Sequence, residues 1–251
     1  MTELTAAAFT ERLLAVASEE ERVERLRYFK TGPGDYAEHD TFIGVRMGEI
    51  FRLAKGFIDL ADEEIERLLD SPIHEVRAGA LSIMDKRARR RSTTEEQRRA
   101  LFELYLRRHD RIDCWDLVDL AAVHVVGRYL AERERGILDD LARSGDVWER
   151  RTAIMATLYF VRAGELDDTY RLAEALLHDE HDMVQKPVGA LLRESGKHDR
   201  PRLLAFLDEH AASMPRTSLR YAMEHLDADT RRHYRARRDQ EETAQNRSGR
   251  R

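Results

Sequence analysis

The sequence predicts an all-α protein built from repeated helices, and three observations support this. Glycine and proline are scarce, with 13 and 5 residues in a chain of 251, whereas strands joined by tight turns would use more of both. Alanine, leucine, arginine and glutamate dominate the chain, and all four favour helix. Apolar residues recur at the spacings of one helical face. We therefore expect helices packed on helices, with no sheet.

The bulk composition bounds the class of protein. Hydrophobic residues make up 42% of the chain, an ordinary fraction, so a folded core is expected although 36% of residues are charged. The single cysteine, Cys114, excludes an intrachain disulfide, which suits a reducing compartment. The chain lacks the pattern of a signal peptide or a membrane span, so a cytoplasmic protein without membrane contact is expected. A net charge of −5 argues against a nonspecific nucleic-acid coat but permits a local basic face.

The N-terminal third predicts alternating helices and one loop. Residues 3–30 carry apolar positions at helical spacing, and residues 30–40, with two glycines and a proline, predict a loop. A helix is expected near residues 47–55. Another should start at Asp62, because the acidic residues Glu63 and Glu64 favour the first turn of a helix.

A repeat then appears, with a period of roughly 35–40 residues. Similar second helices start at His74, Cys114, Trp148 and Asp182, each after a short polar turn and an earlier amphipathic helix. Units of this kind are typical of HEAT-like repeats, which stack into a solenoid with one concave face. A basic residue recurs near the start of three of these helices, at Arg77, Arg151 and Lys186. The repeat therefore predicts a HEAT-like solenoid with a concave basic face. Its charge alone fits either the phosphates of duplex DNA or a solvated basic stripe on an ordinary solenoid.

The C-terminal end predicts a change of character. Residues 203–210 and 217–226 form the last expected helical pair, whereas residues 231–251 are charged and nearly free of apolar side chains. We expect a single domain over residues 1–230, followed over residues 231–251 by a frayed helix end and a disordered tail.

Trp115 and Asp119 form the most informative pair in the chain. They lie four residues apart in an apolar helical run, so they share one face of a helix. A tryptophan ring beside a carboxylate can hold a cation or a developing cationic centre. The alternatives are a core tryptophan and a buried ion pair, for which Arg151 of the next repeat is a candidate partner of Asp119.

Two neighbouring features allow more than one interpretation: a possible metal site at His178 and His181, and the start of the helix that contains Pro187. His178 and His181 lie in an acidic turn, but without a third histidine at fitting spacing they predict a polar turn and no metal site. Asp182 and Gln185 suggest a capping box, which would place Pro187 inside the helix. The helix start near Pro187 is therefore left open between a start at Gln185 and a distorted first turn.

Four motifs in order resemble the AlkD-type DNA alkylation-repair family. These are FIGVRMGEI at 42–50, CWDLVD at 114–119, WERRTAI at 148–154, and VQKPVGALLRESGK followed by MPRTSLRYAMEHL, within residues 184–226. The resemblance implies a HEAT-like solenoid that acts as a monofunctional glycosylase, excising N3- and N7-alkylated purines from duplex DNA without metal or cofactor. It further implies that a damaged nucleotide is held against the concave face without a pocket, which would permit bulky lesions.

The same resemblance implies roles for individual residues. Trp115 and Asp119 match the family's catalytic pair, Arg151 matches its active-site arginine, and Arg193 matches a DNA-contacting arginine. The family's second cleft tryptophan falls at Ala190, where this chain departs from the pattern. Residues expected to contact DNA are Arg77, Arg150, Lys186 and Arg193, with Trp148 as a substitute ring or a core residue.

The sequence thus predicts an alkylpurine DNA glycosylase that acts as a monomer on double-stranded DNA containing alkylated bases. Asp119 would stabilise positive charge on the sugar and position a water molecule. The alternatives are a non-enzymatic HEAT-like module that binds DNA or protein, having lost activity with the second tryptophan, and a pure protein scaffold. The lesion spectrum, the oligomeric state and any protein partners are left open.

Overall fold

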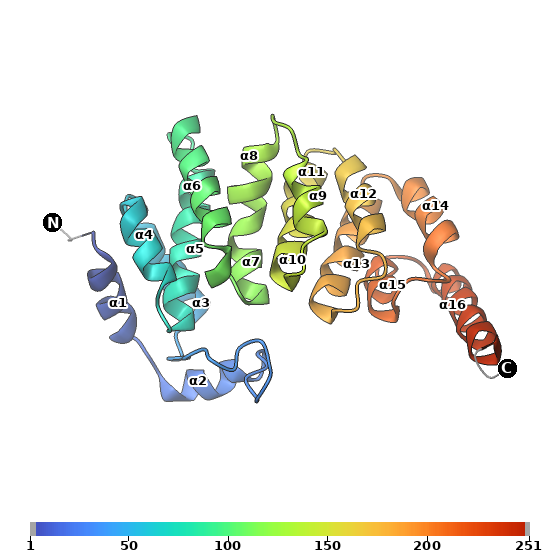
Figure 1. Cartoon of the computed structure of the whole chain (residues 1–251), viewed down its shortest axis with the longest axis horizontal. Helices are drawn as coiled ribbons and strands as arrows, with labels where there is room; N and C mark the ends of the chain where they lie inside the picture. The colour runs from blue at the N-terminus through green and yellow to red at the C-terminus, as the bar shows by residue number, and fades with distance from the viewer. Residues whose placement is uncertain (1–3, 249–251) are drawn as a thin grey trace. The chain divides into compact units, whose positions relative to one another are not determined.

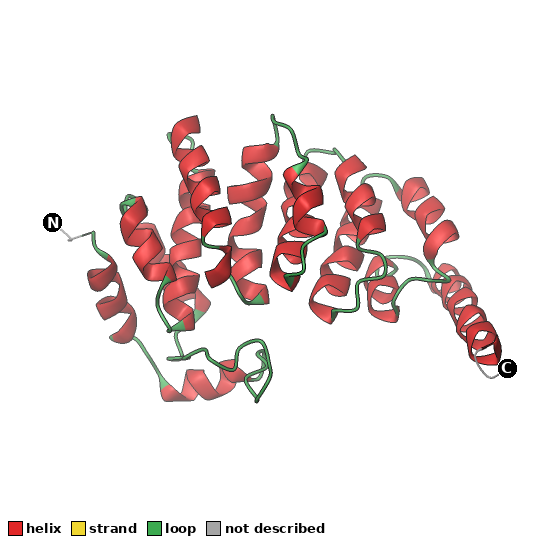
Figure 2. Ribbon diagram, in the orientation of Figure 1, coloured by secondary structure: helices red, strands yellow, loops and turns green. Residues whose placement is uncertain are grey.

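The computed structural model describes residues 4–248, with the side chains of residues 4–239. Within these residues the regular structure consists of helices joined by turns and loops, with one isolated parallel bridge between Thr41 and Ile73 (Figure 2). The predicted all-α, helical-repeat fold is confirmed. None of the described helices combines the length and apolar character required to cross a membrane.

The chain divides into two compact units, Met1–Arg133 and Glu134–Arg251, within the span where the sequence predicted a single domain over residues 1–230. The first unit contains α1 Ala6–Leu14, α2 Glu19–Leu26, α3 Met47–Gly56, α4 Asp62–Leu69, α5 His74–Arg89, α6 Glu95–Arg107, the 3₁₀ turn η1 His109–Arg111, α7 Trp115–Ala121, the π-helical stretch η2 Ala122–Gly127 and α8 Arg128–Leu130 (Figure 1). The second contains α9 Ile137–Ala142, α10 Val147–Ala156, α11 Leu158–Arg162, α12 Asp167–Ala175, α13 Asp182–Gly196, α14 Arg200–His210, α15 Arg216–Ala222 and α16 Ala228–Ser248.

Helix α5 is the centre of the first unit. It packs against α3, α4 and α7, and its side chains are buried on nearly every side. Gly79 permits this packing, because a Cβ at that position would lie 2.4 Å from the ring of Phe9 on α1. Because neighbours surround α5, its first residues are buried in the protein. The polar side chains among them, His74, Glu75 and Arg77, are therefore buried as well.

The segment before α3 is held by a buried carboxylate at the start of α5. Glu75, 2% exposed, accepts hydrogen bonds from the backbone N–H groups of Ile43 at 3.1 Å, Gly44 at 2.8 Å and Val45 at 3.4 Å. Gly44 has a φ of +74°, and a Cβ there would lie 2.0 Å from the Ser18 carbonyl oxygen. The loop thus satisfies its buried amides without regular structure.

In the second unit α13 is central, packing against α10, α14 and α15. The close approach to α15 depends on Gly189, because a Cβ there would lie 2.3 Å from the Ser218 carbonyl oxygen. α10 starts at an effective N-cap, since Asp146 accepts from the N–H groups of Trp148 and Glu149. The second helices of the predicted repeats, α5, α7, α10 and α13, begin within one residue of the predicted starts.

The C-terminal segment differs from the expectation. α16 runs from Ala228 to Ser248, where the charged composition predicted a frayed end and a disordered tail from residue 231. Its anchor is Tyr234, which is 3% exposed and donates to the Leu204 carbonyl at 3.2 Å. One buried aromatic residue and several arginine–carboxylate pairs, such as Arg232 with Asp229, therefore support a helix that has almost no apolar face. Residues 249–251 of the predicted tail lie outside the described residues.

Candidate functional site

A buried hydrogen-bond network lies beneath the start of α7. His74, the first residue of α5, is 2% exposed and joins Asp40 and Asp116, with both N···O distances 2.8 Å, through Nδ1 and Nε2 respectively. Burial alone would lower the pKa of this imidazole, but the charge of Asp116 and the hydrogen bonds to both carboxylates raise it to about 9. His74 is therefore an imidazolium at neutral pH that donates to both carboxylates.

Arg77 belongs to the same network. It is 1% exposed, and its Nη2 donates to Asp40 Oδ1 at 2.6 Å and to Asp113 Oδ1 at 2.9 Å, while Nη1 donates to the Ser71 carbonyl at 3.2 Å. The prediction that Arg77 lines a basic row facing DNA is wrong, because its guanidinium is buried and already neutralised by two carboxylates. Its place is structural, joining the loop before α3 to the turn before α7.

Aromatic rings cover this network. Phe29 stacks against Trp115 at a centroid distance of 5.8 Å and an interplanar angle of 25°. It also contacts Phe42 at 4.8 Å and His74 at 5.0 Å. Trp115 is thus supported on one side by a cluster whose base is a charged imidazolium, which fixes the ring plane.

Trp115 and Asp119 line one cavity of about 300 Å³ in the first unit. Both are half-buried, whereas Leu117, Val118 and Ala121 of α7 are buried in the core. The shared face predicted from their spacing is therefore present in the structure. The complete lining is Arg25, Tyr28, Phe29, Met47, Trp115, Asp116, Asp119 and Leu120.

Sequence reasoning missed the wall opposite α7. Tyr28, Phe29 and Met47 contribute it from the ends of the loop between α2 and α3. Tyr28 is 72% exposed. The available signal in the sequence was the adjacent aromatic pair Tyr28 and Phe29 directly before the predicted loop at residues 30–40. Arg25 brings a positive charge to the same wall, and its buried Nε has no hydrogen-bond partner among the described residues. The cavity thus combines aromatic faces with charges of both signs.

Three potential metal ligands also meet beside the cavity. His74, Cys114 and Asp116 place ligand atoms within 4.8 Å of one another, the one such group found in the described part of the chain. Both nitrogens of His74 are occupied by carboxylates, and burial raises the pKa of the Cys114 thiol well above its usual range. A metal here would have to displace hydrogen bonds and remove a strongly held proton, so the residues present do not fit one.

In the second unit, Arg151 resolves the question of Pro187. α13 begins at Asp182 with His181 as its N-cap, in place of the predicted Asp182, so Pro187 lies inside the helix. Proline has no N–H to donate to the Met183 carbonyl four residues earlier. Arg151, 6% exposed, donates to that carbonyl through Nη1 at 2.6 Å. The backbone bond that proline removes is replaced by a side chain that the resemblance assigns to the active site.

This arrangement predicts an energetic coupling between the two positions. Arg151→Leu should cost about 1–3 kcal/mol of unfolding free energy, because the buried Met183 carbonyl loses its donor. In a Pro187→Ala background the alanine N–H can bond the same carbonyl, so the cost of Arg151→Leu should fall by about 1 kcal/mol. Urea unfolding of the four proteins in the cycle measures the coupling, and equal costs in both backgrounds would contradict it.

Each of the remaining predicted residues of the second unit forms a ring contact, a hydrogen bond or an ion pair within the protein. Trp148 is 7% exposed and contacts the ring of His181 at 6.5 Å, so it is a core residue and not an open ring. Arg150 donates through Nε to Asp179 at 2.6 Å. Lys186 pairs with Asp182, and Arg193 pairs with Glu194 and Glu224. The exposed parts of Lys186 and Arg193 can exchange these carboxylates for phosphate, because such surface pairs contribute little.

Comparison with known proteins supports the identity of the fold. A family model described as DNA alkylation repair enzyme matches residues 9–226, which span most of the chain. No curated protein matches. A solved structure described as a predicted DNA alkylation repair enzyme from Enterococcus faecalis is similar at a TM-score of 0.64 and 17% identity, covering 84% of this chain and 97% of that chain.

The solved structure, at this identity, shows the fold alone, whereas the family model matches the stretch that contains α7, α10 and α13 with their named residues. The chain belongs to the DNA alkylation repair enzyme family.

Proposed function

We propose that this protein is a monofunctional DNA glycosylase that hydrolyses the N-glycosidic bond of N3- and N7-alkylated purines in duplex DNA. The supporting observation is that Trp115 and Asp119 line one cavity together with further aromatic residues. Alkylation at N3 or N7 makes the purine cationic, so the base departs with the bonding electron pair as a neutral molecule. Water then adds to the sugar carbon and loses a proton, and the reaction requires neither a general acid nor a metal.

Each member of the pair has a distinct role in this proposal. As the bond to the base lengthens, the sugar gains oxocarbenium character, and the Asp119 carboxylate stabilises that charge and aligns the attacking water. Trp115 presents its ring to the cationic nucleotide. The stack of Trp115 on Phe29 holds the ring in place, so little reorganisation is required when the lesion arrives.

We further infer that the helical pairs are HEAT-like units with a concave basic face, and that the protein binds duplex DNA as a cytoplasmic monomer. Arg150, Arg151, Lys186 and Arg193 of the second unit are the residues we assign to this face, with Arg151 also in the catalytic group. In this proposal Lys186 and Arg193 give sequence-independent contacts to phosphates, which fits an enzyme that must inspect any sequence.

Ala190 lowers the expected efficiency without removing the chemistry. A cation–aromatic contact contributes roughly 0.5–2 kcal/mol, so replacing the family's second tryptophan by alanine should cost a few-fold to about thirtyfold. A preorganised electrostatic stabiliser is worth about 10²–10³, and the carboxylate that supplies it is retained as Asp119. The enzyme should therefore be weaker or differently selective.

Release of 7-methylguanine and 3-methyladenine from methylated duplex DNA tests the proposal. Time-dependent release of free base, with no release of normal guanine from unmodified DNA, is the expected result. DNA binding without release of either base would favour a non-enzymatic module, and the absence of any salt-dependent DNA affinity would indicate a protein scaffold.

A further inference from the structure

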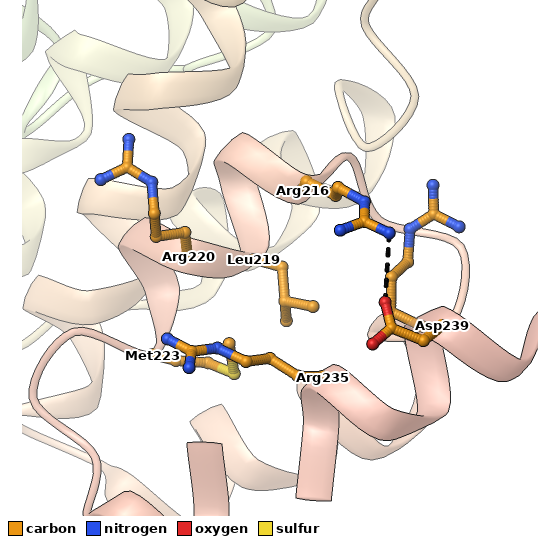
Figure 3. A pocket seen from close by; sticks show the side chains of 7 residues that line it. Arg216, Leu219, Arg220, Met223, Arg235 and Asp239 are labelled. Atoms are coloured by element: carbon orange, nitrogen blue, oxygen red, sulfur yellow. Dashed lines mark hydrogen bonds and ion pairs between the residues drawn. The ribbon is translucent and has the colours of Figure 1, made fainter. Parts of the chain in front are cut away.

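An arginine-rich cavity lies between α15 and α16, entirely within the second unit (Figure 3). Its volume is about 290 Å³. The lining residues are Arg216, Leu219, Arg220, Met223, Arg235, Arg238 and Asp239. Four of these seven side chains are arginines, which we call the α15–α16 arginine cluster: Arg216, Arg220, Arg235 and Arg238.

Three of these guanidinium groups have no carboxylate partner among the described side chains. Arg220 and Arg235 are exposed, and Arg238 is half-buried with an Nε that is buried and has no hydrogen-bond partner among the described residues. Arg216 pairs with Asp239 at 3.1 Å. Many arginines elsewhere form ion pairs with carboxylates. Arg108, for example, contacts three carboxylates. The cluster is therefore short of negative charge in a chain whose net charge is −5.

The fold holds these charges together against their repulsion. Leu219 of α15 and Met223, the residue directly after α15, are buried and line the cavity. Tyr234 fixes α16 by hydrogen bonds to the Leu204 carbonyl and, at 3.0 Å, to Asp208 Oδ1. Arg235 and Arg238 are three residues apart, so they lie on one face of α16, and both line the cavity.

The local composition points to a polyanion. Residues 216–239 contain seven arginines and four carboxylates, a formal charge of +3. Guanidinium groups bind phosphate oxygens in a bidentate geometry and lose little hydration on doing so, which is why arginine predominates at phosphate sites. Neighbouring cations that repel one another are stabilised when a phosphate backbone replaces the missing counter-charges.

We propose that the α15–α16 arginine cluster binds backbone phosphates of duplex DNA, as a contact surface separate from the Trp115–Asp119 cavity. α16 begins at Ala228, beyond the segment 9–226 that matches the family model, so the residues it adds come from outside that match. The inference rests on the proposed function only in that the partner is duplex DNA. It concerns affinity, and assigns no part of the bond-breaking step to these residues.

The test is the salt dependence of binding to undamaged duplex DNA, measured by fluorescence anisotropy on the full-length protein. A plot of log K against log salt has a negative slope, and each lost phosphate contact reduces the magnitude of that slope by about 0.9. Arg235→Gln combined with Arg238→Gln should therefore reduce the magnitude of the slope by about 2 and weaken binding roughly sixtyfold near 0.1 M salt. The effect should be the same for unrelated DNA sequences, because phosphate contacts carry no sequence information.

A matched control removes the same charge elsewhere. Arg143, which follows α9 and pairs with Asp140, and Arg171 of α12, which pairs with Asp168, both lie outside the lining of the cavity. Arg143→Gln combined with Arg171→Gln therefore removes the same charge without altering the cluster. This control should leave the slope within about 0.5 of the wild-type value. Far-UV circular dichroism verifies that α16 persists in both double variants, and lysine at positions 235 and 238 should restore the slope.

The outcomes separate this inference from the proposed glycosylase. An unchanged slope in the cluster variant, or an equal loss in the control, would overturn the inference while leaving base release intact. A reduced slope together with no base release by the wild type would uphold the cluster and refute the glycosylase. If inorganic phosphate raises the Tm of the wild type above its value in chloride at equal ionic strength while the DNA slope stays unchanged, the cluster is a site for free phosphate and the inference fails.

Discussion

Asp119→Asn is expected to lower the rate of 7-methylguanine release at least 10²-fold. The substitution keeps the size of the side chain and replaces a full negative charge by a neutral amide, so the oxocarbenium loses its electrostatic stabiliser. Single-turnover kinetics on methylated duplex DNA measures the change directly. The expected loss corresponds to about 2.7 kcal/mol or more in the activation free energy.

Two comparisons make this result specific. Glu96→Gln removes one carboxylate from an exposed position at the start of α6 and should leave base release unchanged. DNA affinity of the Asp119→Asn variant should stay within about threefold of the wild type, since removing a negative charge does not weaken phosphate contacts. An Asp119→Asn enzyme that releases base at the wild-type rate would exclude Asp119 from the chemistry, even with the family assignment intact.

The second large effect is expected in stability as a function of pH. The pKa of His74 is about 9 in the folded protein and near 6.5 in the unfolded chain. Because the folded state holds this proton more tightly, the stabilisation is complete below pH 6.5 and is lost as the pH rises through about 9. The shift corresponds to a loss on the order of 3 kcal/mol.

Asp40 limits the stability of the protein at acidic pH. Burial raises the pKa of this carboxyl, but the hydrogen bond from His74 and the charge of Arg77 outweigh burial and hold the pKa below its usual 3.8. Its contribution is therefore present above pH 3.8 and is lost as the pH falls through the folded-state pKa. The network should stabilise the protein most between about pH 4 and 6.5.

Urea unfolding between pH 5 and 10 measures the basic limb of this profile. His74→Gln should lower the stability at pH 6 and flatten the decline between pH 7 and 9.5, because the titrating group is gone while a hydrogen-bond donor remains. The facing groups Asp40, Asp116 and Arg77 are unchanged in this variant, so the difference between the two profiles isolates the imidazole. A parallel decline in both proteins would assign the pH dependence to other groups.

The sequence anticipated what depends on local spacing. Helix starts at residues 62 and 74 follow from nearby turn and charge signals, and the structure begins α4 and α5 there. The shared face of Trp115 and Asp119 follows from a four-residue spacing on α7 and is likewise present. Such features require only the geometry of one helix, so they can be deduced without knowing the fold.

What the sequence missed depends on contacts between distant segments. Arg77 had the charge of a DNA-binding residue, but Asp40 and Asp113, both more than 30 positions away, neutralise it in the interior. Pro187 could not be interpreted until Arg151 was seen to supply the missing donor 36 positions away. The prediction for the segment of α16 rested on composition alone. It missed the helix because one buried tyrosine, Tyr234, anchors a segment that otherwise has the charge content of a disordered tail.

The cavity wall has a consequence for how lesion range and catalysis can change. Trp115, Asp116, Asp119 and Leu120 line the cavity from α7, whereas the other half of the lining comes from residues 25–47. This second half includes a loop end, where side chains can be exchanged without disturbing the helix that carries Asp119. Under the proposed function, the size of adduct accepted would thus be set by residues 25–47 and the bond-cleaving step by α7, two separate stretches of the gene. Substitutions in residues 25–47 could then change the lesion range while α7 keeps the carboxylate that the chemistry requires.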